Sequence, residues 1–331
     1  MTILNKILNL KLSNNDNTSS TSSTTPESIS SPSTPSSTSI DQHIIDSGFE
    51  ISDCSETCED CTFHYPKSLK FEENEPLWHS TKPFGLHLNI STGKTDWPHD
   101  ATGLKGTLSN KIANWASEKS GKTSIGNIKV TCSSLGNDEL LIDDEYIQQK
   151  KGDVLILPYF LWIKGIYIDE VDEIFNKLLN IIDENNLYNK QTNQQQELKF
   201  ETIKQQIPTI IEDENKAYVL FCSHKTRDKR CGITAPIMKK EMDLYLREVG
   251  LYRDFGDLTP GGVKIAFINH IGGHKFAANV IIYLKNTGQN IWLGLCKPNN
   301  VKPIVDQCII GEGKVWPVKV RILQKFNPIE W

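Results

Sequence analysis

The sequence predicts an α/β protein in which a mixed sheet is flanked by helices. Short apolar runs rich in β-branched residues, typical of buried strands, alternate with longer stretches whose apolar residues recur at helical spacing. At 331 residues the chain is long enough for two domains, and a stretch rich in asparagine and glutamine separates two such series of elements. We therefore expect two α/β domains joined by a linker.

The first 47 residues are expected to form a disordered arm. Ser19–Ser39 consists almost entirely of serine, threonine and proline, and such a segment cannot bury enough apolar surface to offset its ordering entropy. Ahead of it, Met1–Leu12 combines apolar residues with two lysines in a weakly amphipathic pattern. This pattern makes a mitochondrial presequence an alternative to a cytoplasmic location, although arginine, which is typical of such presequences, is absent.

Residues 48–184 are predicted to form the N-terminal domain, and residues 185–208 the linker. The domain is expected to contain, in order, a strand at Leu86–Ile90, a helix at Leu108–Ser117, strands at Ile128–Cys132 and Val154–Leu157, and a helix at Val171–Ile182. The last helix gathers its apolar residues on one face, as expected for packing against a sheet.

Residues 209–331 are predicted to form the C-terminal domain. Its expected elements are a strand at Tyr218–Phe221, a helix at Ile233–Val249, strands at Val263–Ile268, Val280–Leu284 and Ile291–Leu295, and a closing helix at Val301–Ile310. The order β-α-β-β-β-α is that of a mixed, thioredoxin-like sheet.

Two cysteines and two histidines in this domain are the candidate metal ligands. Cys222 ends the first strand, and Cys231 stands just before the first helix, whose N-terminal dipole favours a thiolate. His270 and His274 form a His-x-Gly-Gly-His turn after the second strand. Soft thiolate sulfur together with borderline imidazole nitrogen indicates either zinc or an iron–sulfur cluster.

The spacing of the cysteines distinguishes the two metals. A zinc knuckle usually has two to four residues between its cysteines, whereas eight residues separate Cys222 from Cys231, although the histidine spacing suits zinc. A two-iron cluster is wider than one ion and tolerates the longer arc, and Gly272 and Gly273 allow close backbone approach because they lack Cβ. A metal-free alternative is two buried cysteines with two loop histidines bonded to backbone.

The segments Cys222–Gly232 and His270–Tyr283 resemble the thioredoxin-like ferredoxins of the sucrase/ferredoxin-like family. The fungal members of this family are named for actin-patch distribution and for altered inheritance of mitochondria. The similarity extends to residues 93–97, 154–158, 291–294 and 304–306 and covers about residues 50–331. The resemblance implies a [2Fe–2S] cluster held by Cys222, Cys231, His270 and His274. It also suggests that the N-terminal domain is a degenerate copy without the ligands.

The charge of that ligand set has consequences for redox chemistry. Two thiolates and two neutral imidazoles leave the oxidised centre neutral, whereas four thiolates make it a dianion, so the mixed centre accepts an electron more readily. We expect a potential above that of all-cysteine ferredoxins, as in Rieske centres at roughly −150 to +300 mV against about −400 mV. Because the added electron makes the imidazoles more basic, electron uptake is expected to be coupled to proton uptake.

Two other functions stay open. One is a thiol–disulfide oxidoreductase that uses Cys222 or Cys231 and needs neither histidine; the other is a zinc-stabilised interaction module. His224 forms a Cys-x-His pair with Cys222 and could compete as a ligand, or it could be a hydrogen-bond donor behind the ligands or a surface side chain. On the cluster hypothesis the chain is an electron carrier or redox sensor rather than an enzyme.

Three further cysteines, Cys54, Cys58 and Cys61, have the spacing of radical-SAM enzymes. That motif normally has an aromatic residue before its third cysteine, where this chain has Asp60, so we reject it. A dithiol pair or a small zinc site that adds His64 are alternatives to a purely structural or disordered segment. The acidic neighbours of Cys58 and Cys61 would raise their pKa values and reduce their nucleophilicity.

The loop around the first ligand pair is basic. The positive residues are Lys225, Arg227, Lys229, Arg230 and Lys275, against Asp228. A positive rim would raise the cluster potential and dock an acidic redox partner protein. The alternative is a solvated loop with internal ion pairs. The patch is too small, in a chain of net charge −5, to indicate a nucleic-acid partner.

The remaining features concern location. No apolar run approaches 18 residues, so no membrane span is expected, and eight irregularly spaced cysteines without a signal peptide favour a reducing compartment. The terminal Ile329-Glu330-Trp331 is similar to the signal that recruits clients to the cytosolic iron–sulfur assembly machinery. An exposed aromatic side chain beside a free carboxylate suits a partner pocket, and a tail packed on the domain is the alternative. We therefore expect a cytoplasmic protein.

Overall fold

A computed structural model describes residues 37–331 of the chain with the exception of Gln195. The predictions for Met1–Leu12 and for most of the disordered arm fall on residues outside that range. The described end of the predicted arm, Ser37–Asp46, forms helix α1 rather than a disordered segment. Ile40 and Ile44 stand about one helical turn apart and pack against the C-terminal core, which stabilises the helix.

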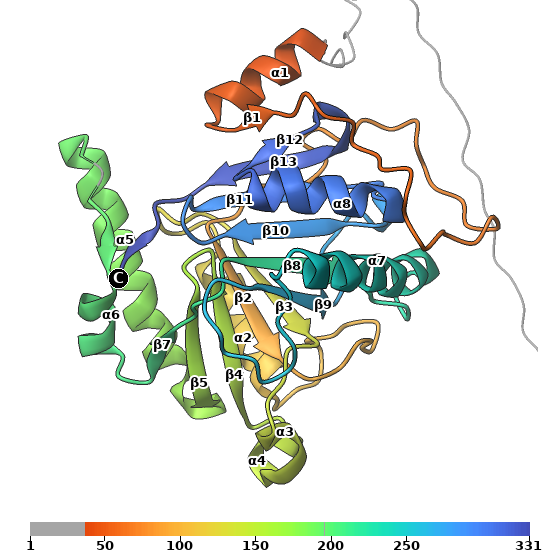
Figure 1. The fold of residues 1–331 in the computed structure, drawn as a ribbon. Helices are drawn as coiled ribbons and strands as arrows, with labels where there is room; N and C mark the ends of the chain where they lie inside the picture. The colour runs from red at the N-terminus through yellow and green to blue at the C-terminus, as the bar shows by residue number, and fades with distance from the viewer. Residues whose placement is uncertain (1–36, 195) are drawn as a thin grey trace, which may run out of the picture. The chain divides into compact units, whose positions relative to one another are not determined.

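Ten strands form one mixed sheet in the order β13-β11-β10-β8-β9-β3-β2-β4-β5-β7 (Figure 1). Their bounds are β2 Leu86–Ser91, β3 Ile128–Ser133, β4 Lys151–Leu157, β5 Leu161–Tyr167, β7 Ile210–Glu212, β8 Ala217–Cys222, β9 Val263–Ile268, β10 Val280–Leu284, β11 Gln289–Leu293 and β13 Val320–Lys325. Two short parallel pairs lie outside this sheet: β1 (Glu50–Ile51) with β12 (Lys314–Val315), and β6 (Leu198–Lys199) with β14 (Ile329–Glu330).

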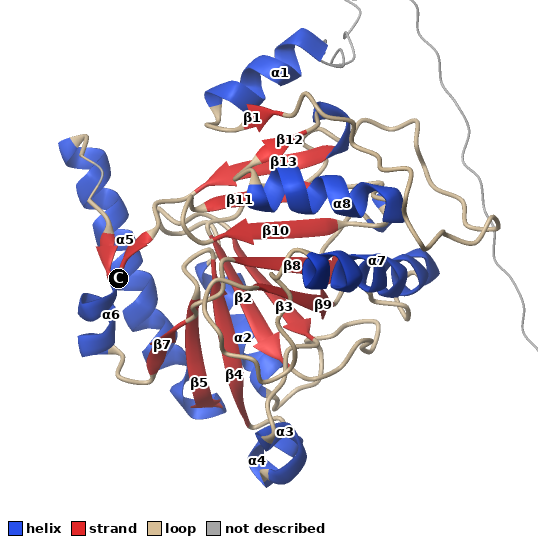
Figure 2. Cartoon of the chain, viewed as in Figure 1, coloured by secondary structure: helices blue, strands red, loops and turns tan. Residues whose placement is uncertain are grey.

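The helices flank this sheet (Figure 2). They are α2 Leu108–Lys119, α3 Glu139–Ile142, α4 Asp144–Ile147, α5 Val171–Thr192, α6 Phe200–Gln206, α7 Lys229–Glu248 and α8 Val301–Pro303, which continues as a π-helical segment over Ile304–Ile310. The mixed α/β fold with flanking helices is thereby confirmed. Part of the predicted linker is nevertheless ordered, because α5 continues past Ile182 and α6 buries Ile203 in the N-terminal core.

The two halves of the sheet repeat one topology. In the order β9-β8-β10-β11, the first two strands are parallel and β10 is antiparallel to both of its neighbours. The order β3-β2-β4-β5 has the same directions. The halves meet where β3 and β9 pair antiparallel at Ser133 and Ile268, so the sheet runs through both. The predicted β-α-β-β-β-α order is therefore present twice, while the division into two domains stays a prediction.

Three large apolar clusters hold these elements together. One packs α2 and α5 on the N-terminal half, and a second packs α7 and α8 on the C-terminal half. The third is shared, since it joins Leu155 and Trp162 of the N-terminal half to Tyr218 and Tyr283 of the other. None of the helices among residues 37–331 is both long and apolar enough to cross a bilayer.

A buried histidine links the two halves. His87 of β2 is fully buried, and its two ring nitrogens each lie 2.8 Å from a hydroxyl oxygen, that of Tyr283 on β10 and that of Thr131 on β3. Burial, assisted by the charge of Lys129, lowers the pKa of His87 to about 3. The imidazole is therefore neutral at pH 7, with one nitrogen donating and the other accepting.

Because His87 is buried and neutral, we predict that the free energy of unfolding decreases on acidification at pH values well above the pKa of His87 in the folded protein. In the unfolded chain the imidazole has its ordinary pKa of 6.5 and binds a proton below that pH, whereas the folded protein keeps it neutral down to about pH 3. Stability is therefore complete above pH 7 and falls as pH drops through 6.5, by about 2 kcal/mol at pH 5 from this residue alone.

Urea unfolding between pH 7.5 and pH 5 measures this loss. The His87→Gln variant offers a non-titrating donor and acceptor in the same place, so it should lose less stability than the natural protein over that interval. Parallel stability curves for the two proteins would contradict the assignment.

Candidate metal centre

The first ligand pair is delivered by one strand and one helix. Cys222 is the last residue of β8, and Cys231 is the third residue of α7. The carboxylate of Asp228 caps this helix by accepting the backbone N–H of Arg230 at 2.8 Å. The cap lies within the cysteine loop, which is why α7 begins at Lys229 rather than at the predicted Ile233.

The second pair follows from the parallel pairing of β8 with β9. Cys222 is paired with Ile268, the last residue of β9, so both strands end at the same edge of the sheet. His270 comes two residues after this edge, and His274 begins a short 3₁₀ turn. The parallel register therefore brings a loop 48 residues away in the chain beside Cys222.

The four predicted ligand residues lie together. The Cys222 sulfur is 4.0 Å from Nδ1 of His270, and Nε2 of His270 is 3.4 Å from Nδ1 of His274. The two cysteines are hydrogen-bonded to each other and are 2% and 1% exposed. The side chain of His274 is 42% exposed. Sulfur therefore lies on the buried side of the site and imidazole on the open side.

The chemistry of this donor set suits a two-iron cluster. Within the described part of the chain, no three or more histidine, cysteine, aspartate and glutamate side chains are grouped so as to hold a single metal ion. The four candidate ligands form a sulfur pair and an adjacent nitrogen pair. A donor set of two cysteines and two histidines, with each pair on one iron, is the set that Rieske-type [2Fe–2S] clusters use.

The two thiols differ in acidity. Cys222 accepts a hydrogen bond from Cys231, which lowers the pKa of Cys222 to about 5 despite its burial. His270 contributes to the same shift. The same hydrogen bond and burial raise the pKa of Cys231. Burial and the neighbouring His270 also lower the pKa of His274. Without metal, Cys222 is thus the thiolate of the pair and His274 a neutral imidazole.

His224 supports the site from behind. It is 1% exposed, and its Nδ1 accepts the backbone N–H of His270 at 3.1 Å. Its Nε2 donates toward the backbone carbonyls of Trp97 and Pro98 at 2.9 and 3.0 Å. Both ring nitrogens are therefore engaged. His224 lies behind the candidate ligands as predicted, but toward His270 it accepts a hydrogen bond and does not donate one.

The Gly-Gly turn is shaped by a buried arginine that sequence patterns did not single out. Gly273 has a φ of +70°, and a Cβ there would lie 2.3 Å from the Arg321 guanidinium, whereas nothing lies within 4 Å of a Cβ at Gly272. Glycine is needed at 273 because the guanidinium packs directly against the backbone. Arg321 belongs to β13, whose sequence Val-Arg-Ile-Leu-Gln-Lys gives no signal that the arginine is buried.

An acidic segment covers the cysteines. Phe71 packs against the small apolar cluster that the two cysteines form with Ala277, and the residues that follow it form ion pairs with the basic rim. Glu72 lies 3.5 Å from Arg230, and Glu75 is paired with Lys275. Two of the five predicted rim cations are therefore neutralised from within the chain, while Lys225 and Lys229 are exposed.

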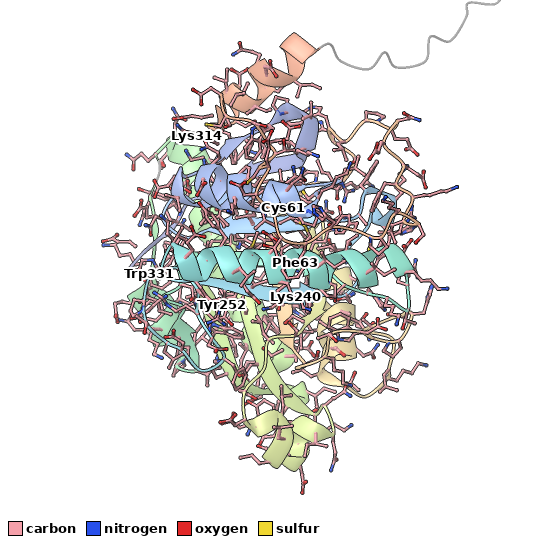
Figure 3. The ribbon with its side chains drawn as sticks, turned by 45° about the vertical axis from the view of Figure 1, so that its right-hand side comes forward. Cys61, Phe63, Lys240, Tyr252, Lys314 and Trp331 are labelled. Carbon is pink, nitrogen blue, oxygen red and sulfur yellow. The ribbon has the colours of Figure 1, made fainter. Side chains whose placement is uncertain are left out.

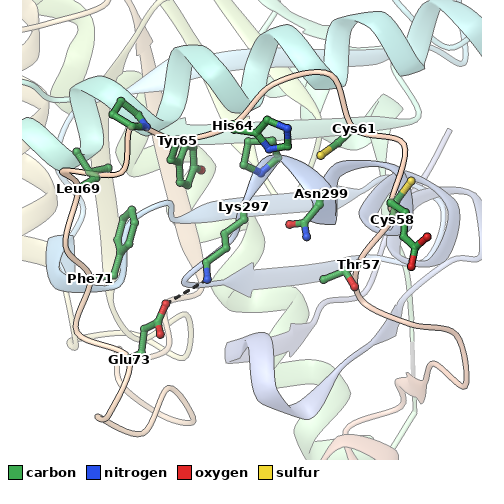
Figure 4. A pocket seen from close by; sticks show the side chains of 13 residues that line it. Thr57, Cys58, Cys61, His64, Tyr65, Leu69, Phe71, Glu73, Lys297 and Asn299 are labelled. Carbon is green, nitrogen blue, oxygen red and sulfur yellow. Dashed lines mark hydrogen bonds and ion pairs between the residues drawn. The ribbon is translucent and has the colours of Figure 1, made fainter.

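The other side of Phe71 borders a cavity of about 650 Å³ (Figure 4). Cys58, Cys61 and His64 line it, and Cys54 is exposed outside it. The segment is ordered rather than disordered, since the backbone N–H groups of Thr62 and Phe63 donate to the carboxylate of Glu241 at 3.1 and 3.0 Å. Lys240 of α7 also lies 5.8 Å from the Phe63 ring centroid (Figure 3).

Burial, with the charges of Glu241 and Cys58 acting in the same direction, raises the pKa of Cys61. The thiol is thus protonated at neutral pH, but the carboxylate that contributes is Glu241 of α7 and not the acidic neighbours within the segment that we expected to act. The zinc alternative is not supported, because Cys54 lies outside this cavity and no three of Cys54, Cys58, Cys61 and His64 are grouped closely enough to hold a metal ion in the described structure.

Comparison with known proteins places the chain in a family. The family model described as sucrase/ferredoxin-like matches residues 77–322, which include all four candidate ligands. The chain belongs to the sucrase/ferredoxin-like family. The resemblance inferred from the two ligand segments is therefore confirmed.

Two relatives show how far the similarity within the sucrase/ferredoxin-like family extends. Actin patches distal protein 1 of Saccharomyces cerevisiae is 40% identical over 284 residues, 83% of this chain and 85% of that protein. Altered inheritance of mitochondria protein 32 of Debaryomyces hansenii is 37% identical over 109 residues, 33% of this chain and 36% of that protein.

Among solved structures, a thioredoxin-like [2Fe–2S] ferredoxin from Aquifex aeolicus matches 34% of this chain and 96% of its own, with 17% identity and a TM-score of 0.24. A TM-score this low does not establish a shared fold or site.

The Gly273 contact predicts an unusually costly substitution. Gly273→Ala should combine a left-handed backbone, costing about 1–2 kcal/mol, with a clash against Arg321 that adds roughly 1–3 kcal/mol. The free energy of unfolding of the metal-free protein measures the total.

The matched control is Gly121→Ala, where φ is +74° but nothing lies within 4 Å of the added methyl group. The stability of Gly121→Ala should fall only by the cost of the left-handed backbone, about 1–2 kcal/mol. Equal losses in the two variants would show that the guanidinium does not press on the turn.

Proposed function

We propose that this chain is an electron-transfer protein in which Cys222 and Cys231 hold one iron of a [2Fe–2S] cluster and His270 and His274 hold the other. The observation that carries the proposal is the convergence of a buried thiol pair and a partly exposed imidazole pair at one sheet edge. Membership of a family described as sucrase/ferredoxin-like agrees with it.

Such a cluster, when bound, supplies reversible one-electron chemistry. The buried cysteines keep the sulfur ligands away from water, and the exposed side chain of His274 is the face from which a redox partner and protons can approach. Two neutral imidazoles in place of two thiolates favour electron uptake. The free ring nitrogen of each ligating histidine is the group expected to take up a proton with the electron.

A thiol–disulfide oxidoreductase is the second candidate, favoured by the lowered pKa of Cys222 and its hydrogen bond with Cys231. Against it, both thiols are almost fully buried under Phe71, so a disulfide substrate has no direct access to them. This alternative predicts disulfide reduction that survives loss of His270 and His274. A zinc-stabilised module, the third candidate, predicts zinc without sulfide.

Partner and location are further parts of the proposal. The exposed Lys225 and Lys229 beside the site suit an acidic redox partner protein. The terminal Ile329-Glu330-Trp331 is proposed to recruit the cytosolic iron–sulfur assembly machinery, which would make the chain cytoplasmic. Trp331 supports this as an accessible handle, because it is 45% exposed while its ring packs on Phe200 at a centroid distance of 5.4 Å.

The ligand assignment predicts how histidine replacement changes the cluster. After anaerobic purification the natural protein should contain iron and acid-labile sulfide and give an EPR signal on reduction with dithionite. His270→Cys and His274→Cys should each keep a cluster, but with a potential lower by on the order of 100 mV or more and a weaker dependence on pH, since each adds a negative ligand.

His64→Cys, which changes an exposed histidine outside the site, is the control and should leave the potential unchanged. Protein that holds zinc and no sulfide would end the cluster proposal. Unchanged potentials in both ligand variants would remove the histidines from the ligand set.

The tail proposal predicts that deletion of Trp331 reduces cluster loading in cells without harming the site. Loss of an aromatic anchor should weaken binding to the assembly machinery about tenfold or more, and the iron content of protein isolated from cells should fall accordingly. Chemical reconstitution of the same variant should restore full iron and sulfide.

Phe200→Leu removes the ring on which Trp331 packs and keeps the indole, so it should load normally in cells. If both variants load normally and both lose stability, the tail only packs on the domain.

A further inference from the structure

Arg321 is the most deeply buried cation among the described residues. It lies on β13, is 1% exposed and is among the largest fully buried side chains. No aspartate or glutamate of the described chain forms an ion pair with it; the nearby group that favours its charge is Cys222. A buried charge without a counter-charge costs several kcal/mol, so the site beside it is expected to supply one.

The partners of the guanidinium are neutral. Its Nη1 donates to Oδ1 of Asn279 at 2.6 Å and to the carbonyl of Gly272 at 3.2 Å. Its Nε and Nη2 donate to the hydroxyl and the carbonyl oxygen of Ser80 at 2.9 and 3.0 Å. These bonds fix the orientation of the group but cancel none of its charge.

Two aromatic rings enclose the remaining surface of the guanidinium. Its carbon lies 4.7 Å from the Trp292 centroid and 5.1 Å from the Phe276 centroid. The environment is therefore apolar and poor in water, so the field of the charge is weakly screened. Although burial lowers the pKa of Arg321 to about 10, the group is still positively charged at neutral pH.

The guanidinium also holds the turn that joins the two histidines. It binds the carbonyl of Gly272, and the position of a Cβ on Gly273 lies 2.3 Å from it. Asn279 completes the arrangement, because its Nδ2 donates to the carbonyl of Gly273 at 2.9 Å while its Oδ1 accepts from Arg321. The charged guanidinium is thus in direct contact with the backbone that joins His270 to His274.

We infer that Arg321 is the internal counter-charge of the proposed cluster: it stabilises the added electron, and so raises the reduction potential. The inference rests on the proposed function. A centre that is neutral when oxidised becomes an anion on reduction, and a fixed cation behind its ligands stabilises the anion more than the neutral form. Because the guanidinium keeps its proton at neutral pH and below, this contribution does not change with pH in that range.

Two variants remove the charge in different ways. Arg321→Met deletes it from a side chain of similar length. Asn279→Asp leaves the arginine in place and puts a carboxylate where Nη1 now donates, which neutralises the charge within its own hydrogen-bond network. Each should keep iron and sulfide at the natural content and lower the midpoint potential by at least 59 mV, a tenfold shift in the ratio of reduced to oxidised protein. The slope of potential against pH should not change.

Two further variants separate charge from structure. Arg321→Lys keeps the charge and loses the planar fork, so its potential should stay closer to the natural value than that of Arg321→Met. Lys129→Met removes another half-buried cation, whose Nζ lies 6.0 Å from the same Trp292 ring but makes no contact with the turn. It should shift the potential less than either charge-removing variant.

The outcomes are distinguishable by redox titration of each loaded protein followed by its visible spectrum. If the natural protein holds a cluster and neither Arg321→Met nor Asn279→Asp lowers its potential, the inference is overturned and the proposed function stands. If one of the two does not fold, the other decides. A natural protein without iron and sulfide ends both.

Discussion

The site depends on the parallel register of β8 and β9. Pairing of Cys222 with Ile268 ends both strands at the same edge, so the loop after β9 must start beside the cysteine. A shift of one residue would turn every β8 side chain to the opposite face and move Cys222 away from His270. The register is fixed by burial on both faces, since Val219 and Phe221 pack against α7 and α8, and Tyr218 and Leu220 pack in the shared cluster. Core packing therefore determines where the ligands meet.

In the N-terminal half, β2 and β3 end at a corresponding edge of the sheet, but without the cysteine and histidine side chains that could bind a metal. Ile90 pairs with Val154 on β4 as Phe221 pairs with Val280 on β10, so Ser91 occupies the place of Cys222. Serine is a poor ligand for iron compared with a thiolate. The half contributes in another way: the chain after β2 supplies the carbonyls of Trp97 and Pro98 that hold His224, and through it the backbone of His270. The N-terminal half has no candidate ligands of its own, but through His224 it orients His270 of the C-terminal half.

Local pattern predicted most of this fold and the identity of the candidate ligands. The strands at β2, β8, β9 and β10 agree with the apolar runs to within a residue, because a buried strand must be apolar on both faces. What the sequence could not reveal depends on long-range contacts. Arg321 looks like an ordinary polar residue of a strand, and its burial arises only when Ser80 and the Gly272 turn close over it. Likewise, Glu72 lies 158 residues from Arg230, so an ion pair between them leaves no local signal.

If the site holds the proposed cluster, its polarity restricts how electrons would enter it. On the sulfur side, Phe71 covers the cysteines, and Glu72 and Glu75 tie the covering segment to Arg230 and Lys275. Beneath the turn, Arg321 and its aromatic neighbours exclude water. The imidazole edge is the open one, with His274 half-exposed. Three rim cations, Lys225, Arg227 and Lys229, form no ion pair with a described residue, and all three are exposed in the segment between the two cysteines. We therefore expect an acidic partner to be attracted by the positive charges of this loop and to come closest to the site at the histidines. The histidines are also the proposed ligands that would exchange a proton with the solvent, so electron transfer and protonation would use the same surface.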